Sequence, residues 1–392
     1  MKKVLVPRVR FKGFSEEWKE ERLENIYSFA SEGGTPDTNK DIYYKPGLFY
    51  FTKIEDMANK YISHTKSKIS ELGLKNSSAW IIPRNNILFS NGATIGNVSI
   101  NKVDLSTKQG IVGMIIKKKF NLEFICYLLK SENFQSKVAE KITVGTIPTV
   151  AIFNLKKIEL FLSKNIYEQQ KIGKLLENID NLITIEQSKL NKLKQLKETL
   201  LQKMFPEGNS KTPRIRFKGF SKEWKEEKLE YIAKVTNGKS NTSDNNKWGQ
   251  YNLYIRSEEI YKSNKYIFDV EGVITVGDGN IGKIFHYVNG KFDLHQRCYL
   301  IYEFQNIWPK YFYYYFSQNF YKRAILMSYT ATVNSIRMNT ITDMDIMFPK
   351  ELIEQQKIGD FFSYIDTLIN LYQSKLNKLK QIKEALLQKL LI

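Results

Sequence analysis

A 37-residue segment that occurs twice constrains the fold of this chain more than any other feature. Residues 168–204 and 354–390 are identical at 25 of these 37 positions, and neither copy contains a proline. Apolar residues recur every three or four positions, which predicts two amphipathic helices of roughly 55 Å each. Because one such helix cannot bury its apolar stripe alone, we expect the two copies to pair antiparallel as a short coiled coil. The seam is expected to contain Ile172, Ile179, Leu190, Leu193, Ile358, Ile365, Leu376 and Leu379.

A shorter repeat lies near the start of each half of the chain. The phrase "PRVRFKGFSEEWKEERL" (7–23) returns at 213–229 with 14 of 17 positions identical. Each half therefore contains a short constant segment, a variable region and a long helix, an internal pseudo-twofold repeat. The predicted divisions are an N-terminal segment 1–23, a globular domain 24–167, a helix 168–206, a linker with the repeated segment 207–229, a second globular domain 230–353 and a second helix 354–392. The constant aromatic residues are expected to pack each domain against the helices: Phe11, Phe14, Trp18, Phe217, Phe220 and Trp224.

The two variable regions combine strand and helix patterns, so the fold class is α/β in the broad α+β sense. Both regions are expected to share one fold, because short matches persist between them at a constant offset. The aromatic run 311–323 is interpreted as core rather than as a platform for unpaired bases. Strands are predicted at 47–57, 85–90, 110–119, 251–257, 271–276 and 298–304, and helices at 122–141 and 309–328.

Composition restricts the partners. Lys and Arg number 60 against 41 acidic residues, a net charge of +19 that favours a polyanion such as nucleic acid, although A/T-rich codon usage produces a similar bias. Two cysteines and three histidines without finger spacing argue against a structural metal, and they fit a reducing cytoplasm. No apolar run is long enough to span a membrane.

Catalytic motifs are weak. Gly277, Gly279 and Gly282 spell GxGxxG, but "KIFHYV" follows as a strand where a dinucleotide site needs a helix, so a turn is predicted. Glu17 and Glu223 each begin an ExK pair that lacks the upstream acid a nuclease needs. No base-methylation tetrapeptide, GxSxG or HExxH is present. We therefore expect no catalytic residues and no metal site in this chain.

The order of the repeated motifs resembles a known family. Each half of the chain contains P-x-x-R-F-x-G-F-x-x-x-W, followed about 150 residues later by E-Q-x-K-I and a long Lys/Leu/Gln helix. This order, present twice, is similar to that of the specificity subunit of bacterial type I restriction-modification systems. The resemblance implies a non-catalytic DNA reader whose two target recognition domains, joined by antiparallel helices, each read one half of an asymmetric bipartite target.

The resemblance also implies partners and cofactors. The helices would dock two methyltransferase subunits that bind S-adenosylmethionine and methylate adenine. Restriction subunits that depend on ATP and Mg²⁺ would join them, and this chain itself would bind no cofactor. Double-stranded DNA is the expected ligand, and a membrane is not. The alternative reading is a coiled-coil scaffold or adaptor whose two globular ends bind proteins and that lacks sequence-specific DNA binding.

Residues that read bases are sought at loop tips near the ends of the predicted strands. Asn and Gln pair with adenine through two hydrogen bonds, and Arg pairs with guanine in the same way. An ordinary loop cap or a phosphate contact is the alternative for each residue. The candidates are Asn91, Thr94, Lys108, Gln109, Thr146 and Thr149 in the first domain, and Arg256, Asn280, His295, Gln296, Arg297, Asn334 and Arg337 in the second.

Overall fold

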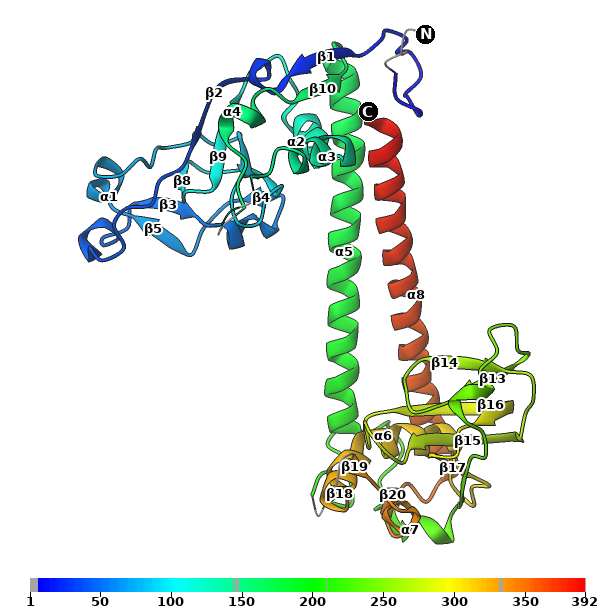
Figure 1. Cartoon of the computed structure of the whole chain (residues 1–392). Coiled ribbons are helices and arrows are strands. Elements are labelled where there is room, and N and C mark those ends of the chain that lie inside the picture. Colours follow the sequence, from blue (N-terminus) through cyan, green and yellow to red (C-terminus); the bar gives the residue numbers. More distant parts are fainter. Residues whose placement is uncertain (1–5, 144, 146–147, 209, 331–333, 392) are drawn as a thin grey trace. The chain divides into compact units, whose positions relative to one another are not determined.

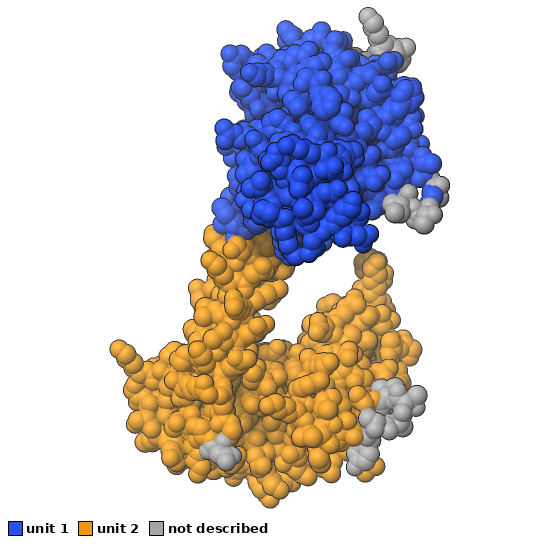
Figure 2. All heavy atoms as spheres, turned by 90° about the vertical axis from the view of Figure 1, so that its left-hand side faces the viewer, with its two compact units in different colours: residues 1–186, 375–392 blue, residues 187–374 orange. Residues whose placement is uncertain are grey.

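A computed structural model describes residues 6–143, 145, 148–208, 210–330 and 334–391 (Figure 1). The chain separates into two compact units, which Figure 2 shows in different colours. Unit 1 contains residues 1–186 and 375–392, and unit 2 contains residues 187–374. The two long predicted helices are confirmed as α5 (Ile166–Met204) and α8 (Leu352–Leu390), and each contributes one part to each unit.

Antiparallel pairing of α5 with α8 is found within each unit. In unit 1, Lys383 Nζ lies 2.7 Å from Asp180 Oδ1, and Lys375 Nζ lies 3.0 Å from Glu186 Oε1. The pairing in unit 2 includes Lys197 Nζ, 2.5 Å from Asp366 Oδ1. In unit 1, residues further along α5 pair with residues earlier in α8, which is the antiparallel order that the coiled-coil prediction requires. Of the eight predicted seam residues, six are buried and two, Leu193 and Leu379, are partly buried.

Unit 1 carries its strands in three sheets. Five strands lie in the order β2-β9-β6-β7-β4, three in the order β5-β3-β8, and the pair β1-β10 joins the short constant segment to the end of the domain. The strands are β1 (Lys19–Arg22), β2 (Tyr27–Glu32), β3 (Phe49–Thr52), β4 (Tyr61–Ile62), β5 (Ser67–Ile69), β6 (Ile87–Ser90), β7 (Val98–Asn101), β8 (Leu105–Thr107), β9 (Ile111–Ile116) and β10 (Glu159–Leu162). The helices are α1 (Glu71–Lys75), α2 (Leu122–Lys130), α3 (Glu132–Ala139) and α4 (Ile152–Leu155).

Unit 2 carries a six-stranded sheet in the order β12-β17-β15-β16-β13-β14. The pair β11-β20 repeats β1-β10, and β18 pairs antiparallel with β19. The strands are β11 (Lys225–Lys228), β12 (Lys234–Asn237), β13 (Tyr251–Tyr254), β14 (Ile260–Ser263), β15 (Phe268–Val276), β16 (Phe285–Leu294), β17 (Cys298–Tyr302), β18 (Tyr329–Thr330), β19 (Asn334–Ser335) and β20 (Asp345–Phe348). The helices are α6 (Pro309–Leu326) and α7 (Met338–Thr342).

The strand orders of the two sheet systems correspond, as expected from a shared fold, except that β4 has no counterpart in the six-stranded sheet. In unit 2 the long strand β16 pairs antiparallel with β15 and, through its last residues, parallel with β13. In unit 1 the same path is interrupted between β7 and β8, so that β7 pairs with β6 and β8 pairs in parallel with β3. One sheet in unit 2 thus corresponds to two sheets in unit 1.

Two sequence predictions need correction. The helix expected at 122–141 is divided into α2 and α3, because Ser131 adopts an extended backbone and its hydroxyl accepts a hydrogen bond from the Phe134 amide. The strand expected at 47–57 ends at Thr52. A short 3-10 turn follows, and its first residues are held by the carboxylate of Asp56, which accepts from the Lys53 amide at 2.8 Å.

The aromatic run on α6 lies in the core of unit 2, as predicted. Tyr311, Phe312, Phe316 and Phe320 are fully buried, and their rings form part of one cluster with Phe205 and Trp224. Because these rings already contact one another, they offer no open stacking surface. Figure 1 shows α6 beside the strands of this unit.

Candidate nucleic-acid interface

Three backbone segments meet in the same way in each unit. In unit 1 the amide of Asn91, after β6, donates to the Gly110 carbonyl at 2.9 Å. The Val150 amide in turn donates to the Asn91 carbonyl at 2.8 Å. These bonds join the loop after β6, the turn between β8 and β9, and the segment around Thr149, which forms an isolated bridge with Gly92.

Unit 2 repeats these bonds with different residues. The Gly277 amide donates to the Arg297 carbonyl at 2.8 Å, and the Ile336 amide donates to the Gly277 carbonyl at 2.9 Å. The next residue, Asp278, forms an isolated bridge with Ser335, as Gly92 does with Thr149. Both units therefore present one arrangement of three loops, and we name these arrangements loop site 1 and loop site 2.

Glycines make the first of these loops possible in loop site 2. Gly279 has a φ of 74° and Gly282 a φ of 65°, a backbone region that favours glycine. A Cβ on Gly282 would also lie only 2.8 Å from the Tyr321 Cα atom. Strand β16 follows at Phe285, so the prediction that this GxGxxG is a turn is confirmed.

Loop site 1 surrounds a cavity of about 470 Å³. The predicted residues Lys108, Gln109 and Thr149 line it, and all three are exposed. Glu32 also lies there, and its carboxylate accepts from the Gly110 amide at 2.6 Å. Because the cavity combines acceptors and donors on exposed side chains, it offers the mixed hydrogen-bonding groups that base edges require. The remaining lining residues are Thr35, Lys53, Ile54, Glu55, Gly92, Ala93 and Gly110.

Three predicted residues of the first domain lie outside that lining. Asn91 is buried, and its side-chain amide donates to the Val150 carbonyl at 3.1 Å, so it holds the loop and does not face outward. Thr94 is exposed at the loop tip, where its carbonyl accepts from the Ser90 hydroxyl at 2.5 Å. Thr146 lies outside the described residues.

Loop site 2 is organised around the carboxylate of Asp278, which is almost completely buried. Arg256 Nη1 lies 3.2 Å from both of its oxygens, and Arg297 Nη1 lies 2.9 Å from Oδ2. The two arginine side chains remain exposed, at 44% and 63%. Two adjacent cavities of about 370 and 190 Å³ share Asp278 in their walls; Arg256 and Asn280 line the first, and Gln296 and Arg297 line the second.

The other predicted residues of the second domain have more local roles. His295 is buried, and its Nδ1 accepts from the Arg297 amide at 3.0 Å. Burial and the nearby Arg256 charge lower the pKa of His295, which favours this neutral accepting ring. Asn334 is exposed and its carbonyl accepts from the Gly279 amide at 2.9 Å, whereas Arg337 is exposed at the start of α7.

The most central residue of loop site 2, Asp278, was missed by the sequence analysis. Its only signal in the sequence is its position between Gly277 and Gly279 in the GxGxxG turn. Acidic Glu32 was missed for the same reason, because a search for DNA contacts favours basic and amide side chains. Only the structure shows that these carboxylates accept hydrogen bonds from neighbouring groups, Asp278 from Arg256 and Arg297 and Glu32 from the Gly110 amide.

The constant aromatic residues lie against the long helices. Trp18 is buried, and its indole Nε1 donates to Glu168 Oε2 on α5 at 3.2 Å. Lys171 Nζ lies 5.9 Å from the Phe11 ring centroid and 5.2 Å from that of Phe14. In unit 2, Trp224 is buried beside Tyr311, Phe217 packs against Phe361, and Lys357 Nζ lies over the Phe220 ring.

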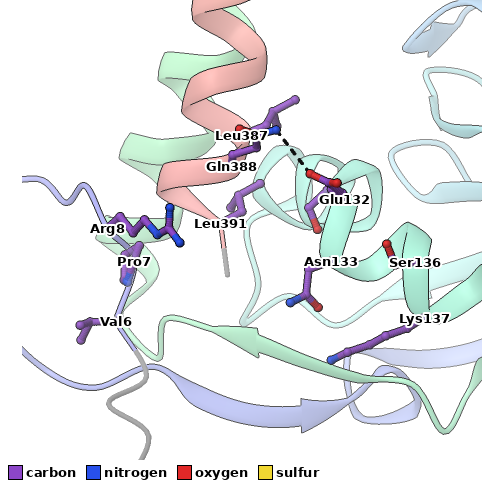
Figure 3. Close-up of a pocket in the computed structure, with 11 residues that line it drawn as sticks. Val6, Pro7, Arg8, Glu132, Asn133, Ser136, Lys137, Leu387, Gln388 and Leu391 are labelled. Atoms are coloured by element: carbon purple, nitrogen blue, oxygen red, sulfur yellow. Dashed lines mark hydrogen bonds between the residues drawn. The ribbon is translucent and has the colours of Figure 1, made fainter.

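A further cavity of about 760 Å³ lies in unit 1, remote in sequence from loop site 1. Figure 3 shows it between Val6–Arg8, helix α3 and the last turn of α8, where Gln388 donates to Glu132 at 3.4 Å. None of the predicted base-reading residues lines it. In the part of the chain that the structure describes, no cluster of three metal-ligating side chains and no helix suited to cross a membrane is found. Cys126 and Cys298 are buried and free.

Comparison with known proteins extends these observations. A family model described as "Type I restriction modification DNA specificity domain" matches residues 15–195 and 221–381. The MjaIX type I restriction enzyme specificity subunit of Methanocaldococcus jannaschii is 32% identical over 171 residues, which are 43% of this chain and 39% of that protein. The EcoDI specificity subunit of Escherichia coli is 31% identical over 166 residues, 42% of this chain and 35% of that protein. The matched stretches thus span less than half the length of these relatives.

A solved structure resembles the whole chain. The S subunit of a type I restriction-modification system from M. genitalium superposes with a TM-score of 0.70 and 15% sequence identity, covering 99% of both chains. At this identity the match establishes the fold, with its two tandem domains and two long helices.

Proposed function

The chain belongs to the type I restriction modification DNA specificity domain family, and from this premise we propose that it is the DNA-reading subunit of such a system. In this proposal each domain binds one half of a bipartite, asymmetric target. The chain then directs modification and restriction subunits to that target. The observation that carries the proposal is the repetition of one backbone arrangement with different side chains in loop sites 1 and 2.

The difference between the two loop sites supports an asymmetric target. Gly92 occupies the position that Asp278 occupies in the second site, as the matched bridges to Thr149 and Ser335 indicate. The shared backbone would place each loop similarly against DNA, while different side chains would meet different base edges. A net charge of +19 supplies phosphate attraction that does not depend on sequence.

Partners and chemistry follow from the same proposal. Adenine methyltransferase subunits would dock on this chain and carry S-adenosylmethionine, and motor-nuclease subunits would use ATP and Mg²⁺. The chain itself would contribute binding and orientation without a catalytic step, in the reducing cytoplasm that its two free cysteines suit. Its similarity to the MjaIX and EcoDI specificity subunits supports this division of labour.

A methylome tests the proposal. Cells that express the chain with its neighbouring methyltransferase should carry methyladenine in one bipartite motif. As a control, the methyltransferase is first shown to be active with another specificity subunit. If the same methyltransferase then yields no bipartite motif with this chain, the proposal fails. The adaptor reading would then gain support if the chain bound duplexes of unrelated sequence with equal affinity at every salt concentration.

A domain exchange tests the assignment of half-sites. Residues 24–150 would be replaced by the corresponding region of a relative with a known motif. We expect one half of the methylated motif to change and the other half to stay the same. A change in both halves would show that the domains do not read independently.

A further inference from the structure

Two arginines in loop site 2 share one buried carboxylate. Asp278 has a side chain that is 6% exposed, and it receives Nη1 of Arg256 at 3.2 Å and Nη1 of Arg297 at 2.9 Å. The backbone on both sides of Asp278 is also fixed, because the Gly277 amide bonds to the Arg297 carbonyl and the Gly279 amide bonds to Asn334. The carboxylate is therefore a fixed point that restricts the direction of both guanidinium groups.

Each guanidinium still has a free donor edge. Only Nη1 of each side chain donates to Asp278, and within the described residues no protein acceptor is bonded to Nε or Nη2 of either arginine. Nε and Nη2 form a planar fork that fits two acceptors at once. Guanine presents such a pair in the major groove, O6 and N7, and it is the most frequent specific partner of arginine.

A buried acid is better suited to base reading than to phosphate binding. A carboxylate beside a phosphate would weaken the attraction of both arginines, since like charges repel in a partly desolvated site. Fixed orientation, by contrast, matters for a bidentate contact with a base edge, because the two hydrogen bonds require a defined direction. The pairing of two exposed arginines with one acid thus lowers the net positive charge of the site and restricts the orientation of both guanidinium groups.

Loop site 1 lacks all three groups. The matched bridges place Gly92 at the position of Asp278, and the matched carbonyl acceptors place Gly110 at the position of Arg297. The parallel pairings of β3 with β8 and of β13 with β16 place Ile54 at the position of Arg256, two residues beyond the strand. The arginine pair is consequently a property of the second domain alone.

We propose that Arg256 and Arg297 read guanine in the half-site of the second domain, and that Asp278 is the positioning residue that aims both side chains. This inference rests on the proposed function. It predicts at least one G·C pair in that half-site, whichever bases the first domain reads.

Chemically altered DNA tests the contact directly. The full chain, in complex with its methyltransferase subunits, would be titrated with its target duplex and with duplexes in which single guanines of the second half-site are replaced by 7-deazaguanine. Loss of N7 at a read guanine should weaken binding roughly 10-fold. In Arg297→Ala or Arg256→Ala, the same replacement should cause no further loss at the guanine that the removed arginine reads. Arg214→Ala, an exposed arginine that pairs with Glu207, is the matched control and should keep the full 7-deazaguanine effect.

The positioning role predicts that affinity and specificity change in opposite directions. Asp278→Asn removes a negative charge, so binding to a non-cognate duplex should become tighter. Discrimination between the target and a duplex with an altered guanine should fall roughly 10-fold, because the guanidinium groups of Arg256 and Arg297 lose their fixed orientation. Asp269→Asn, at the exposed far end of β15, should raise non-cognate binding without loss of discrimination. A purely structural role would weaken binding to both duplexes.

Failure of this inference can be separated from failure of the proposed function. If the wild-type complex does not distinguish its target from a scrambled duplex, the function itself is wrong. If it distinguishes them but the second half-site contains no guanine, or tolerates 7-deazaguanine at every guanine, only the arginine assignment is overturned. If Asp278→Asn keeps full discrimination, the arginines act without the positioning residue. Arg297→Lys, which keeps the charge and removes the fork, should lose discrimination while remaining folded.

Discussion

Arg10 and Glu168, 158 positions apart, form a two-point ion pair in which Nε lies 2.6 Å from Oε1 and Nη2 lies 2.9 Å from Oε2. Arg216 and Glu354 repeat it at 2.7 and 2.9 Å in unit 2. Hydrogen bonding to the carboxylate raises the pKa of each arginine. The pair joins the short constant segment to the first turns of the long helix in each unit. It explains why the sequence keeps both segments constant while the region between them varies.

Glu168→Ala should destabilise unit 1 strongly. The glutamate is fully buried, and its removal leaves Arg10 and the indole of Trp18 without their acceptor. Breaking a buried pair from one side costs about 3–5 kcal/mol. Urea unfolding of the full chain, followed by circular dichroism, measures the loss. Glu17→Ala, which changes an exposed acid in the same segment, should shift the free energy by less than about 0.5 kcal/mol, and equal losses for the two variants would contradict this account.

Tyr314→Phe should loosen the contact of α6 with the helix pair in unit 2. The hydroxyl donates to Asp366 Oδ2 at 2.8 Å, and Lys197 pairs with the other oxygen of that carboxylate. Loss of a hydrogen bond to a charged acceptor should cost about 1.5–3 kcal/mol. Thermal unfolding would detect this change. Tyr364→Phe alters an exposed tyrosine on α8 and should be neutral; if both variants melt alike, the hydroxyl of Tyr314 has no stabilising role.

Two glycines in the loop after β15 should respond differently to alanine. Both have positive φ, which costs alanine about 1–2 kcal/mol. A Cβ on Gly279 meets nothing within 4 Å, whereas one on Gly282 would lie 2.8 Å from Tyr321 Cα and 3.0 Å from Ala324 Cβ. Gly282→Ala should therefore lower the stability of unit 2 clearly more than Gly279→Ala in denaturant titrations. The reverse order would mean that the loop does not pack against α6 as described.

Acid should weaken unit 2 through two histidines, His295, which is buried, and His286, which is partly buried. Burial lowers the pKa of both His286 and His295 from the ordinary value of 6.5. As the pH falls, the unfolded chain therefore binds protons before the folded chain does. The stabilisation by the neutral rings is complete above pH 6.5, and it is lost as the pH falls through the folded pKa values.

Melting temperatures at pH 7.5 and 5.5 measure this dependence. The wild type should lose more stability between the two pH values than the double variant His286→Gln/His295→Gln. His64→Gln, which changes an exposed histidine in unit 1, should retain the wild-type dependence. An unchanged slope in the double variant would assign the acid sensitivity to other groups.

Much of the fold could be predicted because it depends on local patterns. The apolar period defined α5 and α8 to within two residues at their starts, and the predicted start of the helix at Leu122 is confirmed by α2, which Asn121 caps by accepting from the Phe124 amide. Breaks within an element were less predictable. Ser131 divides a continuous helical pattern through one extended residue, and in the sequence it resembles any serine on a helix surface.

The site was predictable only as a set of loops. Polar residues near strand ends pointed to both loop sites, yet Asn91 and His295 face inward, and Asp278 was not recognised. Inward and outward orientation depends on which carbonyls and amides the neighbouring loops present, and composition does not reveal this.

The sequence by itself determined that the chain is a duplication, with two variable domains and two long amphipathic helices, because repeats and helical periods are properties of the order of residues along the chain. Only the tertiary structure decided which residues form each loop site. Asp278 meets Arg256 and Arg297 because β13, β15, β16 and β17 lie side by side in one sheet and bring their connecting loops together. Contacts of this kind depend on strand order and register, and these are set by the packing of the whole domain.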